Sequence, residues 1–486
     1  MALGKRKRKR QETLWIPTGE IPKPPAHPFY KRLNTILAEH GFDDFAEKAC
    51  AKFYAPKMGR PSLAPGIYFR SLLIGYFEGL DSERGIAWRT ADSLALRGFL
   101  GLALTDTPPD HSTISRTRRL IDLETHQAVF TWVLQRLAEA GLLQGKTIGI
   151  DATTLEANAA LRSIVRRDSG EGYQEFLTKL AKESGIETPT RDDLARLDRK
   201  RPKKGSNDDW THPHDPDARI TKMKDGRTHL AHKAEHAVDL DTGAIVGVTV
   251  QGADKGDTTT MIETLITATE QVEATLPEIE GIEEVVGDKG YHSTERITDL
   301  ERLGLRTYIS EPKRPRRRWH GNTEARNAVY ANRRRIRGER GKLLLRKRGE
   351  RLERPFAHLC ETGGMRRTHL RGRANILKRF LIHVSALNLG IVMRAAFGVG
   401  TPRALQGRIR ALVAALNRIH FAVGEFRGAI QGFFYSLIRI FDSFSPTTGY
   451  CWALVPIRTS ATDCQRSFAS NRQVVRHGYE DVGADF

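Results

Sequence analysis

Apolar and polar residues follow two different periods along the chain, and the change of period divides it. In residues 25–135, apolar side chains recur every three or four positions, as in FYKRLNTILAEH and IYFRSLLIGYFEGL. This spacing predicts amphipathic helices. From residue 146 the pattern favours strands, beginning with the short apolar run KTIGIDATT. We therefore expect an all-α N-terminal domain followed by an α/β domain.

The order of elements predicted for residues 136–400 indicates a mixed sheet covered by helices. HLAHKAEHAVDL and AIVGVTVQG flank a turn at residues 241–243 and predict a hairpin. A helix (TTTMIETLITATEQVE), a strand (EEVVGD), a helix (STERITDLERLG) and a strand (RTYIS) follow. Consecutive strands followed by strand–helix alternation are typical of a mixed sheet with helices on its faces.

Three segments follow neither pattern. Residues 1–24 form a basic arm that contains proline, and its KRKRKR run is expected to touch DNA. A charged insertion without a strand pattern occupies about residues 162–227. Residues 401–486 contain two more amphipathic segments and a polar tail, in which we find no candidate chemistry.

The composition points to a polyanionic partner in the cytoplasm. The chain has 78 Lys and Arg against 58 Asp and Glu, a formal charge of +20, and such a surplus is typical of proteins that bind nucleic acid. No apolar stretch follows the N-terminal charges as in a signal peptide, and charged or polar residues interrupt every apolar run, so we expect no membrane segment. The four cysteines are far apart, which disfavours a zinc site and disulfides.

Two segments are candidates for DNA contact. In PPDHSTISRTRRLID, Asp110, Ser112 or Thr113 can cap a helix with a basic face. That helix fits a DNA-reading helix, although a solvated helix in an all-α domain fits equally well. Between residues 311 and 354, 17 Lys or Arg stand against 5 Glu, an excess that favours contact with the DNA backbone. The expected DNA-binding residues are Arg116, Arg118, Arg119, Arg333, Arg334, Arg335, Arg348 and Arg351.

Two aspartates stand where predicted strands end. Asp151 follows the apolar run KTIGI and Asp288 follows VVG. Neighbouring strands lie about 4.8 Å apart, so carboxylates at the strand ends of one sheet can converge. Such oxygen ligands suit Mg²⁺ or Mn²⁺, and two of these ions can support phosphodiester chemistry. Taken singly, either aspartate could equally cap a turn or a helix.

Several segments in a fixed order resemble bacterial insertion-sequence transposases of the DDE type. They are GIDATTLEANA, DPDARI, GDKGYHS, ERPFAHLCETGGMRRTHLRG and, upstream, GRPSLAPGIYFRSLLIGYFEGL with PPDHSTISRTRR, so that the resemblance spans about residues 30–400. It implies a ribonuclease H-like catalytic domain with a five-stranded sheet, in which Asp151, Asp288 and Glu353 are the three acids and hold two Mg²⁺ or Mn²⁺ ions.

The same resemblance implies an activity and partners. The protein is expected to cut double-stranded DNA at the terminal inverted repeats of a transposon and to join the ends to target DNA. It would act as a dimer or larger homo-oligomer in the bacterial cytoplasm, on the nucleoid. A nuclease or resolvase of the same fold, and a DNA-binding relic that no longer cuts, remain alternatives.

The third acid departs from the wider family pattern. Wider relatives have a Tyr and an Arg shortly before the Glu and a Lys seven residues after it, whereas here Gly349 and Cys360 occupy two of those positions. Arg348 and Arg351 are possible substitutes. Pro355 is tolerated only in a first helical turn, which predicts that a helix begins near Glu353. On this helix Glu353 would border the cleft, whereas Glu350 would face solvent.

One further segment matches the sequence motif of a class of enzymes. Residues 232–236, HKAEH, match a zinc-peptidase pattern that requires a helix. The surrounding alternation predicts a strand, on which the two histidines would be roughly 13 Å apart and could not share an ion. We instead expect His236 on the strand beside Asp151.

Overall fold

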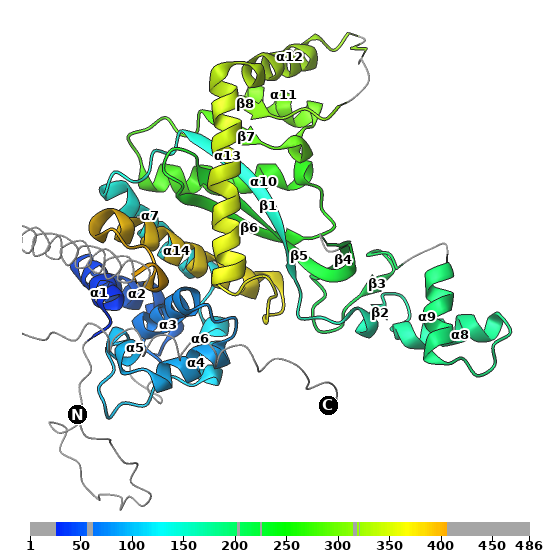
Figure 1. The fold of residues 1–486 in the computed structure, drawn as a ribbon, viewed down its shortest axis with the longest axis horizontal. Coiled ribbons are helices and arrows are strands. Elements are labelled where there is room, and N and C mark those ends of the chain that lie inside the picture. Colours follow the sequence, from blue (N-terminus) through cyan, green and yellow to red (C-terminus); the bar gives the residue numbers. More distant parts are fainter. Residues whose placement is uncertain are drawn as a thin grey trace, which may run out of the picture. The chain divides into compact units, whose positions relative to one another are not determined.

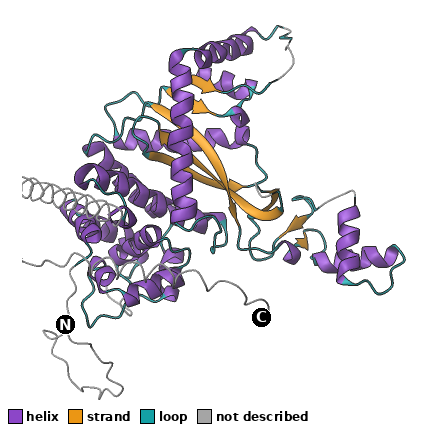
Figure 2. Ribbon diagram, in the orientation of Figure 1, coloured by secondary structure: helices purple, strands orange, loops and turns teal. Residues whose placement is uncertain are grey.

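The computed structural model describes residues 26–55, 62–201, 205–223, 226–313, 318–319 and 321–405. The basic arm at residues 1–24 and the helices expected after residue 405 lie outside the described residues. The described part divides into an N-terminal helical region and a sheet with helices on both faces (Figures 1 and 2).

The N-terminal region is helical, as predicted. Its α-helices are α1 (Pro28–Glu39), α2 (Phe42–Cys50), α3 (Pro65–Glu78), α4 (Glu83–Asp92), α5 (Leu94–Phe99), α6 (His111–Leu120) and α7 (Leu123–Glu139), with a 3₁₀ turn η1 (Ala51–Phe53). Helix α3 is buried on almost all sides, as expected for a helix that is apolar all round. It packs against α14 (Arg373–Phe397), and one continuous core joins this region to the sheet.

The main sheet is mixed, and its centre is β1 (Thr147–Glu156). On one side β1 pairs with antiparallel β5 (Thr228–Asp239), which in turn pairs with β6 (Ile245–Gly252). On the other side it pairs with parallel β7 (Glu284–Gly287), which pairs with parallel β8 (Arg306–Ile309). This order agrees with the expected five-stranded sheet, to which β4 (Arg219–Lys222) adds a short strand along β5.

Helices cover both faces of the sheet. The alternation along β5 separates the faces, because Glu235 bonds to Thr260 and Thr264 of α10 (Asp257–Thr275), whereas His236 stacks on Phe356. Phe356 belongs to α13 (Glu339–Ala357), which crosses the sheet (Figure 1). The remaining elements of this region are η3 (Lys289–Tyr291), α11 (Thr294–Arg302), α12 (Thr323–Arg337) and the π-helical turn η4 (His358–Thr362).

Two predicted boundaries are wrong. Strand β1 does not end at Asp151 but continues to Glu156, because its pairing with β5 extends over the polar residues. Helix α13 begins at Glu339, not near Glu353, and Pro355 lies in its last turn. There the missing N–H costs a single bond to Arg351, just before the backbone passes into the π-helical turn.

The insertion folds around small cores of its own. It contains η2 (Leu161–Ser163), α8 (Tyr173–Glu183), α9 (Arg191–Lys200) and a two-stranded sheet of β2 (Val165–Arg166) and β3 (Trp210–Thr211). Buried apolar residues hold it together, including Trp210, Leu177 and Leu194. The expectation that it lacks strands is wrong for β2, β3 and β4. The polar sequence RITK of β4 gives no apolar alternation, and this strand forms by pairing with β5.

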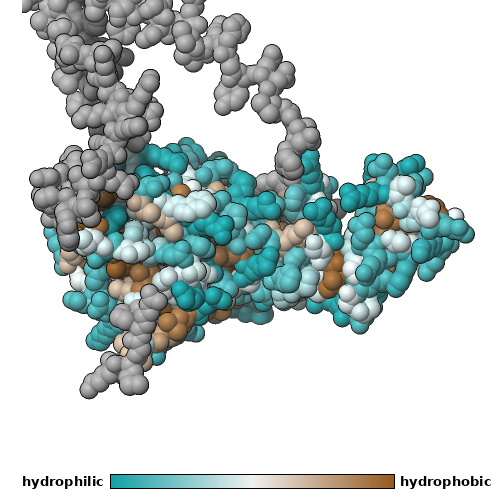
Figure 3. Space-filling view, turned by 90° about the horizontal axis from the view of Figure 1, so that it is seen from below, coloured by the Kyte–Doolittle hydropathy of each residue, from teal (hydrophilic) through white to brown (hydrophobic). Residues whose placement is uncertain are grey.

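One helix in the described part of the chain, within Arg373–Leu405, is long and apolar enough to cross a membrane. The sequence predicts no such segment, because charged residues interrupt its apolar runs. Of the apolar window, 72% is buried, and α14 packs against α3, α7 and β6. This helix is therefore the core helix of the fold, and mainly hydrophilic residues cover the face drawn in Figure 3.

Helix α13 lies close to β1 at Gly149. A Cβ atom built on Gly149 would lie 2.7 Å from Leu352 Cδ1 and 2.7 Å from Leu240 Cδ2. Gly349, on α13 itself, has open space around a built Cβ atom. The absence of a side chain at Gly149 thus sets how near α13 can lie to the strand.

We expect Gly149→Val to lower the free energy of unfolding by about 1–3 kcal/mol, because the added methyl groups overpack the contact with Leu352. The matched change Gly349→Val should alter it by less than about 0.5 kcal/mol, since the position is open. Urea denaturation followed by circular dichroism measures both. Equal stability of the two variants would show that α13 can move away from β1 without cost.

Candidate active site

Asp151 in β1 and Asp288, directly after β7, occupy corresponding positions along two adjacent parallel strands. In the register of β1 and β7, Gly149 is opposite Val286, and each aspartate follows two residues later. Strand β7 ends at Gly287, as predicted, and Asp288 caps the η3 turn by accepting the N–H of Gly290 at 2.8 Å. Because neighbouring strands are about 4.8 Å apart, the two aspartates flank one position at the centre of the sheet.

Asp151 is partly desolvated and surrounded by charge. Its Oδ2 atom lies 3.3 Å from Nη1 of Arg348 on α13, and its side chain is 23% exposed. Burial raises the pKa of Asp151; Arg348 opposes this rise, and the carboxylates of Asp288 and Asp257 add to it. The negative charge gathered here is only partly neutralised, which is the electrostatic setting that a cation stabilises.

Asp257 is an acid of this site that the sequence analysis missed. It is the first residue of α10, and its Oδ1 atom accepts a hydrogen bond from Lys233 Nζ at 2.6 Å. A Cβ atom built on Gly290 would lie 2.5 Å from Asp257 Oδ2 and 3.0 Å from Asp288 Oδ1, so both carboxylates crowd that glycine. In the sequence, an aspartate in a first helical turn indicates only a favourable helix start.

A buried polar network behind the aspartates fixes the turn that follows Asp288. The hydroxyl of Tyr291 in η3 donates to Glu235 Oε1 at 2.7 Å, and Thr260 donates to the same atom at 2.8 Å. Burial raises the pKa of Glu235, while hydrogen bonds from Thr264 and Tyr291 oppose the rise. These bonds tie the turn after β7 to β5 and α10, and so hold Asp288 in place.

The HKAEH segment is part of strand β5, as predicted. His232 Nε2 lies 3.1 Å from Asp215 Oδ2, whereas the ring of His236 stacks on Phe356 with 4.1 Å between centroids. The two histidines therefore have separate partners. His236 is directly opposite Asp151 in the β1–β5 register, which confirms its expected place beside the aspartate.

Glu353 is exposed on α13 and does not touch either aspartate. Among the residues that the structure describes, no three His, Cys, Asp or Glu side chains lie close enough together to hold a metal ion. Glu353 shares a side of α13 with Phe356, three residues later, which stacks on His236 opposite Asp151. Glu350, six residues before Phe356, lies further round the helix from it and lines a hollow with Thr242 and Gly243.

The arginines predicted to bind phosphate differ in their surroundings. Arg333 makes two bonds of 2.6 Å to Glu311, and Arg335 bonds to Glu301 and, at 3.0 Å, to the carbonyl of Thr307. Both therefore hold α12 to neighbouring segments, whereas Arg334 between them is exposed. Of the pair on α13, Arg348 contacts Asp151, and Arg351 donates to the carbonyl of Thr242 at 3.1 Å.

The basic residues of α6 also divide into two groups. Asp110 caps the helix by accepting the N–H of Ser112 at 2.8 Å, as one of the expected caps. Arg116 and Arg119 are exposed. Arg118 is only 6% exposed and forms an ion pair with Glu83 of α4. Its charge is therefore neutralised within the protein.

Comparison with known families agrees with this arrangement. Residues 20–120 match the family described as a transposase domain, and residues 201–389 match the transposase DDE domain. No curated protein is significantly similar to the chain. The two matches together cover more than half of the chain and include Asp288 and Glu353, whereas Asp151 falls between them.

A mixed sheet with this strand order, helices on both faces and a helical N-terminal region is a ribonuclease H-like fold of the transposase type. The chain belongs to the DDE transposases of insertion sequences. Its general function is accordingly DNA transposition, and the family binds DNA and generally uses divalent metal ions.

The ion pair of Arg118 and Glu83 predicts a difference between neighbouring arginines. Arg118→Gln should lower the free energy of unfolding by about 3 kcal/mol, because it leaves Glu83, whose side chain is 14% exposed, without its partner. Arg119→Gln, on the exposed side of α6, should change it by less than about 0.5 kcal/mol. Denaturant titration of both variants tests this, and a neutral Arg118 change would place that side chain in solvent.

Proposed function

We propose that this transposase cuts DNA at the ends of its insertion sequence and joins those ends to target DNA, with Asp151, Asp288 and Glu353 as its catalytic acids. The observation that carries the proposal is the register of β1 and β7, in which Asp151 and Asp288 each follow two residues after the last paired position. A water molecule would attack the phosphodiester at the transposon end and release a 3′-hydroxyl. That hydroxyl would then attack a target phosphodiester, forming one P–O bond as another breaks.

The donor set fits Mg²⁺ or Mn²⁺, because carboxylate oxygens are the ligands that these ions prefer. Asp151 and Asp288 would hold the metal, and Glu353 would complete the set from the side of α13 that it shares with Phe356. Two bound ions would activate the attacking oxygen and stabilise the leaving oxygen. The partly uncompensated negative charge around Asp151 supports this assignment.

Side chains around the acids would position the DNA. Arg348 neutralises Asp151 in this structure, and it would contact a DNA phosphate once that carboxylate binds metal. Lys233 neutralises Asp257, which keeps the N-terminal end of α10 in place beside Asp288. The buried Glu235–Tyr291 bond would prevent the turn after β7 from moving during the reaction.

Exposed basic residues would bind the DNA outside the site. Arg116 and Arg119 on α6 would read transposon ends from the helical region, residues 25–135, while Arg334 would bind phosphates without regard to sequence. Residues 136–400 would form the catalytic domain. Bringing two ends together calls for a dimer or larger oligomer, acting in the bacterial cytoplasm on the nucleoid.

Asp151→Asn and Asp288→Asn should each reduce cleavage of a labelled transposon end in Mg²⁺ by more than about 100-fold, since losing a metal ligand removes several kcal/mol of transition-state stabilisation. End binding, measured by fluorescence anisotropy, should stay within about twofold, because it depends on the basic surface. Asp241→Asn, an exposed aspartate paired with Lys347, is the matched control and should cut normally. An Asp151 or Asp288 variant with more than about a tenth of wild-type cutting would exclude that residue.

The third acid is tested by two glutamates on one helix. Glu353→Gln should abolish strand transfer of pre-cut ends, whereas Glu350→Gln should be close to wild type, because Glu350 faces the hollow near Thr242. Both side chains are exposed, so neither change should alter folding. Gel analysis of joined products separates the outcomes, and a dead Glu350 variant beside an active Glu353 variant would reverse the assignment.

A further inference from the structure

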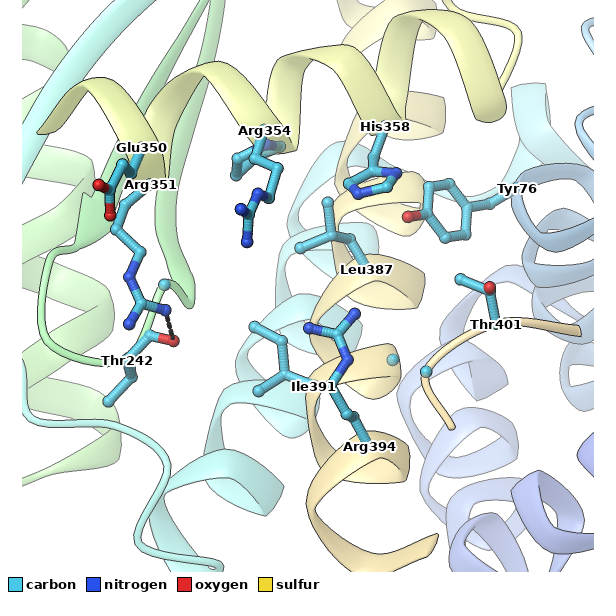
Figure 4. A pocket seen from close by; sticks show the side chains of 14 residues that line it. Tyr76, Thr242, Glu350, Arg351, Arg354, His358, Leu387, Ile391, Arg394 and Thr401 are labelled. Atoms are coloured by element: carbon cyan, nitrogen blue, oxygen red, sulfur yellow. Dashed lines mark hydrogen bonds between the residues drawn. The ribbon is translucent and has the colours of Figure 1, made fainter. Parts of the chain in front are cut away.

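A second basic site lies on the side of α13 away from the catalytic acids. A hollow of about 540 Å³ is lined by residues of α13, α14, the turn between β5 and β6, and residues 400–401 (Figure 4). We propose that this hollow binds a phosphate ester, supplied either by a DNA strand or by a free nucleotide. The inference goes beyond the proposed cutting and joining, since it concerns binding at a place that the acids do not reach.

Three guanidinium groups from two helices line the hollow. Arg351 and Arg354 come from α13 and Arg394 from α14, against a single acid, Glu350. Figure 4 shows the side chains of Arg354 and Arg394 extending into the space between the two helices. Arginine is the side chain best suited to hold a phosphate, because its planar fork can donate two hydrogen bonds at once.

Several other arginines of α12 and α13 are neutralised by carboxylates. Arg333, Arg335 and Arg340 each form an ion pair with a glutamate, and Arg348 pairs with Asp151. In the part of the chain that the structure describes, by contrast, Arg354 and Arg394 form no ion pair. Among the described residues, the hydrogen-bond partner of Arg351 is the carbonyl of Thr242. The hollow therefore keeps a positive charge that no carboxylate in its wall offsets fully.

His358 also lines the hollow. Burial lowers the pKa of His358, and the positive charges of Arg394 and Arg354 lower it further. This histidine therefore stays neutral and can donate or accept a hydrogen bond without adding to the repulsion. Both guanidinium groups act on the same ring, and an anion bound in the hollow would be attracted by both of them.

The remaining wall is apolar and leaves room for more than a phosphate. Pro355, Leu387 and Ile391 line it together with Tyr76, whose ring is 3% exposed. Sites for small molecules typically enclose about 300–1,000 Å³, so the hollow can take a nucleotide. The phosphate would meet the arginines, and the sugar and base would lie against the apolar wall.

The test uses the full chain without metal, so that no DNA is cut. Titration calorimetry with inorganic phosphate and with deoxyadenosine monophosphate measures the site itself. Fluorescence anisotropy with a duplex of random sequence at several salt concentrations measures DNA binding. The variant Arg354→Gln/Arg394→Gln removes two charges from the hollow, and Arg191→Gln/Lys200→Gln removes two exposed charges from α9 as the matched control.

We expect the wild type and the control to bind the nucleotide and the hollow variant to bind it at least about tenfold more weakly. If the ligand is a DNA strand, duplex will displace the nucleotide, and the salt slope will fall by about 0.9 for each lost phosphate contact in the hollow variant alone. If it is a free nucleotide, duplex will not displace it and the salt slopes of both variants will agree. Equal binding of the nucleotide and of DNA by both variants, or no nucleotide binding by the wild type, would overturn the inference. Because the test is made without metal, these outcomes are independent of whether Asp151, Asp288 and Glu353 catalyse cutting.

Discussion

The close contact of α13 with β1 at Gly149 is the constraint on which the site depends. Leu352 can reach the strand only because Gly149 has no side chain. With the helix at that distance, Arg348 contacts Asp151 and Phe356 stacks on His236. At its other end Arg340 bonds to the buried Glu284 of β7. One helix thus spans the centre of the sheet and has different chemistry on its two sides.

The other face of the sheet supplies rigidity. Glu235 is buried on β5 and is held by Tyr291, Thr260 and Thr264. A buried carboxylate of this kind is stable only when its hydrogen bonds are satisfied, and here those bonds connect a strand, a helix and the turn after Asp288. The desolvation that burial imposes is therefore offset by contacts that also fix an acid of the site. The aspartates are more exposed to solvent, so that a cation could replace Arg348 as the partner of Asp151.

Much of this arrangement could be predicted from sequence, and the exceptions have a common cause. The β5–β6 hairpin and β7 were predictable because their sequences have the pattern of strands. Helices α10 and α11 were predictable because their apolar residues recur at helical spacing. The extension of β1 was not, since its polar half is a strand through pairing with β5. The start of α13 was hidden because an arginine-rich helix with few buried residues has no clear apolar stripe. Asp257 and the pairing of Arg335 with Glu301 depend on contacts between distant segments, which no local pattern contains.

The central claim is that one metal-binding centre is built from Asp151, Asp288 and Glu353. It is tested most directly by the anomalous-difference density of Mn²⁺ in crystals of the protein bound to a cut transposon end. The account predicts manganese between the carboxylates of Asp151 and Asp288, with Glu353 as a further ligand. Manganese bound elsewhere, or coordinated by Glu350 in place of Glu353, would contradict it.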